Sequence, residues 1–197
     1  MKIEKKPYNK NKSIINFKYI KKDQNYFEVL NKIKVILSDK MKIKKLDKNK
    51  QIIVSYLKKN LIENKKTNRP KFQLTPNITK EISLLDEKDI LRYLLHRYRY
   101  DIYPLIHHMD NYPPYLQIEP TSFCNFRCVF CFQSNRDFSK KSSGYMGHMK
   151  LDTFKLVIDQ AEGNIEFISL ASRGEPLICR EIEKMLLYTK GKFLNLK

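Results

Sequence analysis

EPTSFCNFRCVFC, the stretch from Glu119 to Cys131, contains three of the four cysteines in this chain of 197 residues. Cys124, Cys128 and Cys131 follow the spacing Cys-x3-Cys-x2-Cys, and Phe130 stands directly before the last of them. Three thiolates on one short loop can hold a soft metal centre. They are one fewer than the ligands that close a structural zinc site or saturate a four-iron cluster, so one metal position would stay open for chemistry.

This cysteine stretch lies within an alternation of strand-like and helix-like segments. Apolar residues over 115–118 precede it, and residues 165–171 form a nearly continuous apolar run, as in a strand buried on both faces. Residues 150–162 and 181–190 carry apolar side chains at helical spacing, and residues 193–196 begin a third strand. The alternation predicts an α/β fold with a parallel sheet, in which ligand loops follow the ends of strands.

The segment 114–197 is short for such a fold. It holds about two and a half βα units, whereas a full barrel of eight units takes roughly 250 residues. We therefore expect an incomplete parallel (β/α) partial barrel. A truncated gene product, or one piece of a split protein whose C-terminal half is missing, would account for this length.

Two stretches of the chain resemble motifs of the radical S-adenosylmethionine (radical SAM) enzymes. The cysteine loop is similar to the family's signature loop. Residues 170–176, LASRGEP, follow an apolar run and are similar to the family's Gly-Gly-Glu-Pro segment, although Arg173 stands in place of its first glycine. A weaker resemblance, in Gly147-His148-Met149, points to the SPASM-type members, which carry a C-terminal extension with further iron–sulfur clusters.

The resemblance implies two cofactors, a 4Fe–4S cluster and S-adenosylmethionine. Cys124, Cys128 and Cys131 would bind three irons of the cluster, and the fourth iron would take the amino and carboxylate groups of S-adenosylmethionine. The protein residues that would contact this second cofactor are Phe130 near the adenine, Gly174 and Glu175 at the methionine end, and Arg173. For Arg173, pairing with Glu175 or contact with the substrate are alternatives.

The resemblance also implies a reaction. Reductive cleavage of S-adenosylmethionine would give a 5′-deoxyadenosyl radical, which abstracts hydrogen from an unknown substrate. Modification of a peptide or a sugar is favoured, and RNA stays open as a substrate. A flavodoxin or ferredoxin would be the electron donor. The sequence singles out no catalytic side chain.

The front of the chain predicts a small basic α+β region and linker over residues 1–80, followed by a helical arm over 81–113. Alternating apolar residues over 15–19 suggest a strand, and helical spacing appears over 25–38 and 86–100. Residues 41–46 and 51–56 could form a hairpin, with which a helix over 51–62 competes. Residues 63–80 are predicted to be a linker, and Ser83 and Asp86 form a pattern typical of a capped helix start.

The net charge of +18 is concentrated at the front, since residues 1–60 contain 18 lysines and five acidic residues. This charge predicts either binding of a polyanion such as RNA or a phosphorylated substrate, or only a lysine-rich composition. No apolar run of about 18 residues predicts a membrane span, and clustered thiols fit a reducing compartment, so we expect a cytoplasmic protein.

Several alternatives remain open from the residues alone. The chain could be a non-catalytic remnant, or a basic binding module with a vestigial cysteine loop. The three cysteines could instead form a zinc site completed by His148, or be ordinary thiols. Cys179, the fourth cysteine, is expected to be a small buried apolar residue rather than a ligand.

Overall fold

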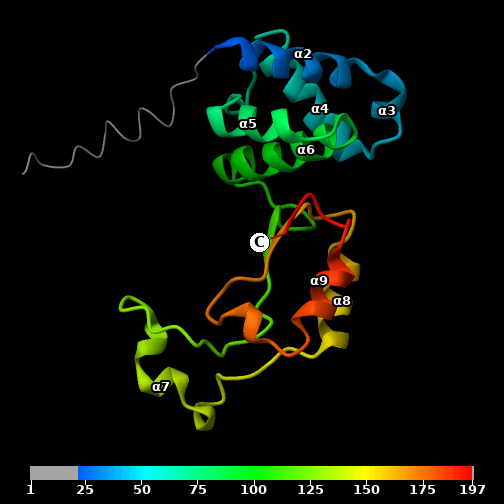
Figure 1. Ribbon diagram of the computed structural model, residues 1–197. Helices are drawn as coiled ribbons and strands as arrows, with labels where there is room; N and C mark the ends of the chain where they lie inside the picture. Colours follow the sequence, from blue (N-terminus) through cyan, green and yellow to red (C-terminus); the bar gives the residue numbers. More distant parts are fainter. Residues whose placement is uncertain (1–21, 197) are drawn as a thin grey trace, which may run out of the picture. The chain divides into compact units, whose positions relative to one another are not determined.

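The computed structural model describes residues 22–196, and within it the chain divides into two compact units, with the boundary in the sequence between His107 and His108 (Figure 1). We call them the helical unit, residues 22–107, and the sheet unit, residues 108–196. Each unit is described by itself. The strand expected over residues 15–19 lies outside the described residues.

The helical unit is built from amphipathic helices whose apolar faces meet in one core. The expected helices over 25–38 and 86–100 are confirmed, and the second of them packs against helices near the front of the unit rather than standing apart as an arm. The elements are α2 (Gln24–Ser38), α3 (Lys40–Lys44), α4 (Lys48–Leu61), α5 (Pro76–Leu84), α6 (Glu87–Ile102) and the 3-10 turn η1 (Pro104–Ile106).

Of the two alternatives for this region, the hairpin of 41–46 and 51–56 was wrong, and the competing helix over 51–62 is confirmed as part of α4, while α3 covers Lys40–Lys44. In α4, Ile53, Val54 and Leu57 are buried on one face, which is helical spacing, and this face packs against α6. Residues 22–107 contain helices and no strand, so the β part of the expected α+β region was wrong wherever it falls in this range.

Helix α5 lies in the segment expected to be a linker. Thr75 accepts a hydrogen bond from the backbone N–H of Ile78, and Pro76 occupies the first helical position, where its missing N–H costs nothing. Ile78 and Ile82 are buried, and α5 packs against α2. Ser83 belongs to α5 rather than to the start of α6, whose N-cap is Asp86.

The sheet unit contains a parallel sheet of three strands in the order β1-β2-β3. The expected alternation of strands and helices is confirmed, so this unit has a mixed α/β fold. Tyr115 pairs with Phe167, and Phe167 pairs in turn with Asn195. The elements that carry this alternation are β1 (Tyr115–Gln117), α8 (Leu151–Ala161), β2 (Phe167–Ser169), η4 (Pro176–Ile178), α9 (Ile182–Thr189) and β3 (Asn195–Leu196).

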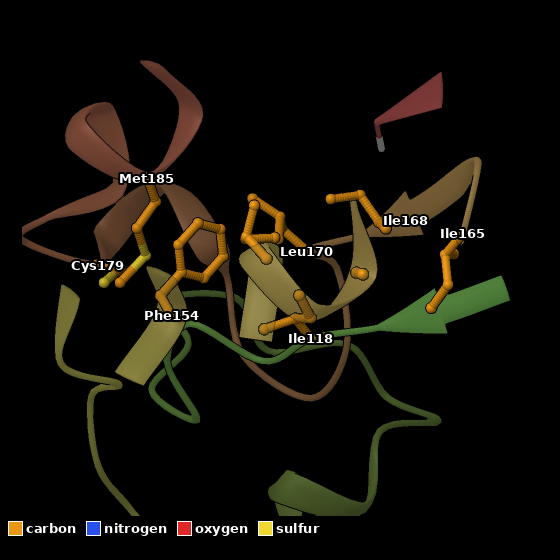
Figure 2. Packing of buried hydrophobic residues seen from close by; sticks show 9 residues of the cluster. Ile118, Phe154, Ile165, Ile168, Leu170, Cys179 and Met185 are labelled. Carbon is orange, nitrogen blue, oxygen red and sulfur yellow. The ribbon is translucent and has the colours of Figure 1, made fainter. Parts of the chain in front are cut away.

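Side chains from the strands and both helices form the core of the sheet unit (Figure 2). Phe154 of α8 and Met185 of α9 are fully buried and lie beside Cys179. Cys179 is therefore a small buried apolar residue, as expected, and takes no part in the cysteine loop. The strand side contributes Ile118, Ile165, Ile168 and Leu170.

A long connection carrying the three cysteines runs from β1 to α8. It contains only short helical pieces and extends away from α8 and α9 in Figure 1. These pieces are η2 (Phe132–Ser134), α7 (Arg136–Ser139) and η3 (Lys141–Ser143). No helix within residues 22–196 is both long enough and apolar enough to span a membrane.

Candidate functional site

The two motif-bearing loops begin at the same edge of the sheet. The cysteine loop follows β1, and the segment Arg173-Gly174-Glu175 follows β2, the neighbouring parallel strand. Because parallel strands end on one side, loops after adjacent strands lie together. The amide Nε2 of Gln117 in β1 donates to the carbonyl of Ala171 at 2.6 Å, which ties the starts of the two loops.

The backbones of these loops touch. The N–H of Glu175 donates to the carbonyl of Phe123 at 2.9 Å. A Cβ atom on Gly174 would lie 1.9 Å from the carbonyl oxygen of Thr121, which is far inside van der Waals contact. Gly174 is therefore required by close approach, because only glycine lets one backbone come so near another.

Arg173 pairs with Glu119 and not with Glu175. Its Nε lies 3.0 Å and 2.9 Å from the two carboxylate oxygens of Glu119, its Nη2 lies 2.5 Å from Oε1, and its backbone N–H donates to Oε2 at 3.1 Å. The hydrogen bonds from the Arg173 side chain hold the pKa of Glu119 below its usual value. Arg173 has no left-handed φ, so this position does not require the glycine of the family pattern.

The segment Gly147-His148-Met149 joins the same site. Its residues pair in antiparallel fashion with the start of the cysteine loop, through a bridge between Thr121 and His148. The N–H of Ser122 donates to the carbonyl of Gly147 at 3.0 Å, and the N–H of Gly147 donates to Ser122 Oγ at 2.7 Å. These bonds hold the two ends of the cysteine connection together.

The three cysteines line one hollow of about 640 Å³. Cys124 and Cys131 are half-buried, Cys128 is exposed, and all three are free thiols. The N–H of Cys131 donates to the carbonyl of Cys128 at 3.0 Å, which closes a tight turn between these two ligand candidates. The other residues around the hollow are Phe123, Phe126, Arg127, Val129, Gln133, Ser134, Ser139 and Met146.

Within residues 22–196, no three His, Cys, Asp or Glu side chains are gathered as ligands of a metal ion. His148 is not among the residues that line the hollow; its ring lies near that of Phe123, with centroids 4.8 Å apart and ring planes tilted by 36°. The donor set still fits an iron–sulfur cluster by its chemistry, because three accessible thiols on one loop share one hollow.

Phe130 points into solvent. Its side chain is 90% exposed, and it is not among the residues around the hollow. Other apolar side chains of this connection are exposed as well, and two ring contacts, Phe132 with Phe138 and Phe138 with Tyr145, join some of them. The structure therefore does not bring Phe130 together with Gly174 and Glu175.

Sequence reasoning missed the residues that hold the site together. Gln133 Nε2 donates to the carbonyl of Ser122 at 2.6 Å, and the carbonyls of Thr121 and Phe123 receive the Gly174-Glu175 backbone. These contacts use backbone atoms or partners far apart in sequence, so no local pattern marks them. The one available signal was the carboxylate of Glu119 directly after a strand.

Comparison of the chain with protein-family models, with curated proteins and with solved structures finds no match of any of the three kinds.

Proposed function

We propose that this chain is a radical SAM iron–sulfur protein. The observation that carries the proposal is the contact between the two motifs, in which the Glu175 N–H donates to the Phe123 carbonyl while Gly174 packs on Thr121. The motifs are separated in sequence by a helix and a strand, yet they meet at one edge of a parallel sheet. Loops after adjacent parallel strands lie near each other in any such sheet; what supports the proposal is that these two loops carry the two motifs and that Gly174 leaves no room for a side chain where they touch.

The proposal also includes a more specific fold for the sheet unit and a cellular compartment for the protein. The three-stranded sheet with α8 and α9 is the beginning of a partial (β/α) barrel, and its ligand loops follow the carboxyl ends of the strands. Because thiolates are needed as ligands, the protein works in a reducing compartment such as the cytoplasm. The proposed partners are a flavodoxin or ferredoxin and a peptide, sugar or RNA substrate.

The proposed roles follow from the resemblance of the two motifs to those of the radical SAM enzymes. Cys124, Cys128 and Cys131 would hold a 4Fe–4S cluster, and Gly174 and Glu175 would hold the methionine end of S-adenosylmethionine. When bound, the cluster supplies the electron that cleaves S-adenosylmethionine reductively, giving a radical able to abstract hydrogen from a substrate.

The chain's own residues have positioning tasks in this chemistry. The backbone of Gly174 leaves no room for a side chain, so the second loop stays close to the cysteine loop. Ser122 ties the start of the cysteine connection to Gly147. Phe130 is free to turn toward a bound ligand, because its side chain is held by few neighbours in its exposed position.

Anaerobic reconstitution with iron and sulfide tests the proposal. We expect an electron paramagnetic resonance signal of a reduced 4Fe–4S cluster that changes when S-adenosylmethionine is added. Cys128→Ala should abolish the cluster, whereas Cys179→Ala should retain it, because Cys179 lies in the core of the sheet unit. A wild-type signal that ignores S-adenosylmethionine, or no cluster at all, would reject the enzyme reading in favour of a remnant.

A second candidate function, polyanion binding, is favoured by a lysine-rich corner formed by residues 40–50. This corner contains six lysines and one acidic residue, Asp47, which caps α4 and pairs with Lys50. Asp39, just before it, caps α3 and pairs with Lys42. Both nearby carboxylates are thus engaged with helix ends and lysines, which leaves a surface of net positive charge suited to RNA phosphates.

A salt titration of binding to a generic single-stranded RNA tests this second function. We expect affinity to fall steeply as salt rises, and the triple variant K44Q/K45Q/K48Q to reduce the slope of that fall. The matched control replaces three lysines of the sheet unit, K155Q/K184Q/K190Q, and should leave the slope unchanged. Equal effects of both triple variants would mean that only overall charge matters.

A further inference from the structure

The ion pair between Glu119 and Arg173 has a geometry that a surface ion pair rarely has. Arg173 presents two nitrogens to the two oxygens of one carboxylate and adds its own backbone N–H as a third donor. The Glu119 side chain is only 21% exposed and that of Arg173 is 42% exposed. A bidentate, partly buried pair of this kind is more directional than a flexible lysine pair.

The pair lies where the two motif-bearing loops leave the sheet. Glu119 is the second residue after β1, and Arg173 stands directly before Gly174. Closing the pair therefore sets the distance between the start of the cysteine loop and the start of the Gly174-Glu175 segment. The bond from the Glu175 N–H to the Phe123 carbonyl lies farther along both loops, two residues beyond Arg173 and four beyond Glu119.

We infer that Glu119 and Arg173 form a positioning pair that holds the Gly174-Glu175 backbone against the cysteine loop. Arg173, the departure from the family's glycine, thereby supplies a contact that glycine cannot make. Its use in cofactor binding rests on the proposed function, whereas the contact between the loops does not. Neither residue touches a reacting atom in this inference; each acts through the backbone that it holds.

The inference explains why an arginine can stand at this position without strain. Arg173 does not have the left-handed backbone that would call for glycine, and its side chain has a carboxylate partner within reach. The close approach that does require glycine occurs one residue later, at Gly174. The two neighbouring positions thus have different tasks: Arg173 holds the loop through its side chain, and Gly174 lets the backbones meet.

Hydrogen exchange of the metal-free protein tests the contact without any cofactor. Arg173→Gln should raise exchange of the Glu175 amide roughly fivefold, because it removes the bidentate bonds and leaves the Phe123 carbonyl contact less restrained. Glu119→Gln should give a similar rise, and the double variant should add little to either, as expected for two residues acting as one unit. Unchanged exchange in Arg173→Gln would overturn the inference.

A second ion pair of the sheet unit supplies the control. Lys192 Nζ lies 2.8 Å from Glu162 Oε2 and 3.5 Å from Asp159 Oδ1, so this pair involves residues of α8 and its end and no residue of either loop. Like Arg173→Gln, Lys192→Gln removes one positive charge from the sheet unit, but it should leave the exchange of the Glu175 amide unchanged. An equal rise in Lys192→Gln would show a general loss of stability and would count against a specific role for Arg173.

Affinity for S-adenosylmethionine separates the inference from the proposed function. In reconstituted protein, Arg173→Gln should raise the Kd for S-adenosylmethionine roughly fivefold, and Arg173→Lys, which keeps charge but loses the planar fork, should fall between it and wild type. Lys192→Gln should bind as wild type does. If Arg173→Gln alters the exchange of the Glu175 amide but leaves the Kd unaltered, the positioning role in cofactor binding is overturned. If the wild-type protein binds no S-adenosylmethionine, the proposed function is rejected, and the contact between the loops is then tested by hydrogen exchange alone.

Discussion

In the described helical unit, four of the five α-helices are capped at their start by a side chain close in sequence, whereas helices α8 and α9 of the sheet unit have no such side-chain cap. Asp23, Asp39, Asp47 and Thr75 begin α2 to α5, and each accepts a hydrogen bond from a backbone N–H three residues later. The N-cap residue of α8 is Lys150, whose side chain provides no such bond. The first N–H of this helix, that of Leu151, donates instead to Glu181 Oε2, 30 residues away.

The same contrast extends to the rest of each unit. In the helical unit, Asn60 binds the N–H of Phe72, 12 residues on. In the sheet unit, Glu119 binds Arg173 over 54 residues and Ser122 binds Gly147 over 25. Hydrogen bonds between residues close in sequence form whenever a helix forms, whereas those between distant residues require the sheet to be assembled first. The candidate site is held together by hydrogen bonds between distant residues.

Among the variants that test this comparison, Gly174→Ala should have the largest effect on stability, and that effect should fall on the sheet unit. Its Cβ would lie 1.9 Å from the Thr121 carbonyl, so one backbone must shift, and we expect a loss of about 2–3 kcal/mol in the opening free energy of the sheet unit. Hydrogen exchange of residues 115–123 measures this loss. The control is Gly147→Ala, since a Cβ there meets nothing within 4 Å. Equal results for both variants would contradict the close approach.

Asp47→Ala should have the next largest effect, and it should be local. Asp47 accepts the Lys50 N–H at 2.9 Å, and removing such an N-cap costs about 1 kcal/mol. Exchange of the first turn of α4 should rise accordingly, while Asp47→Asn, which still provides an acceptor, should lose only a few tenths of that. If the asparagine variant loses as much as the alanine one, charge pairing with Lys50 outweighs capping.

Glu181→Ala should have a smaller effect. The altered residue is the N-cap of α9, but the effect should appear at the start of α8. Its carboxylate accepts the Leu151 N–H at 3.2 Å, so exchange at the start of α8 should rise by an amount that corresponds to about 0.5 kcal/mol. Glu183→Ala removes an exposed carboxylate from the same turn of α9 and is the control. An equal change at α8 in both variants would show that charge, and not the bond to Leu151, is responsible.

The smallest effect we expect is on the titration of Glu119. Because Arg173 holds its pKa below the usual value of 4.5, the pair stabilises the folded protein fully above pH 4.5. This stabilisation is lost as pH falls through the lower folded pKa. Arg173→Gln should raise the Glu119 pKa toward 4.5, as measured by carbon-13 NMR of the carboxyl group, and an unchanged pKa would contradict the pairing.

The apolar spacing of the chain predicted much of the secondary structure, but it left residues 51–56 open between a hairpin strand and a helix over 51–62. Ile52, Ile53 and Val54 in this segment are β-branched, and such residues favour sheets. The structure makes this segment part of α4, because burial of one helical face against α6 stabilises the segment more than its intrinsic preference costs. Helix α5 was missed because it is short and its cap, Thr75-Pro76, lies in a polar stretch.

The candidate site was predicted in its parts but not in its connections. The cysteine spacing and the Gly174-Glu175-Pro176 segment were visible in the sequence, as was their place after strands. The partner of Arg173 was not visible, because Glu175 is nearer in sequence than Glu119 and charge alone cannot choose between them. The exposed position of Phe130 was equally beyond prediction, because it depends on the path of the whole connection.

The sequence by itself determined part of the elements of this protein: the alternation of strands and helices after residue 114, the helices over 25–38 and 86–100, and three cysteines on one loop. These follow from periodicity and from side chains that act within a few residues. Only the tertiary structure decided which carboxylate meets Arg173, which glycine must have no side chain, and that the three thiols share one hollow. Such contacts depend on the distance between chain segments in space, and a linear sequence does not record that distance.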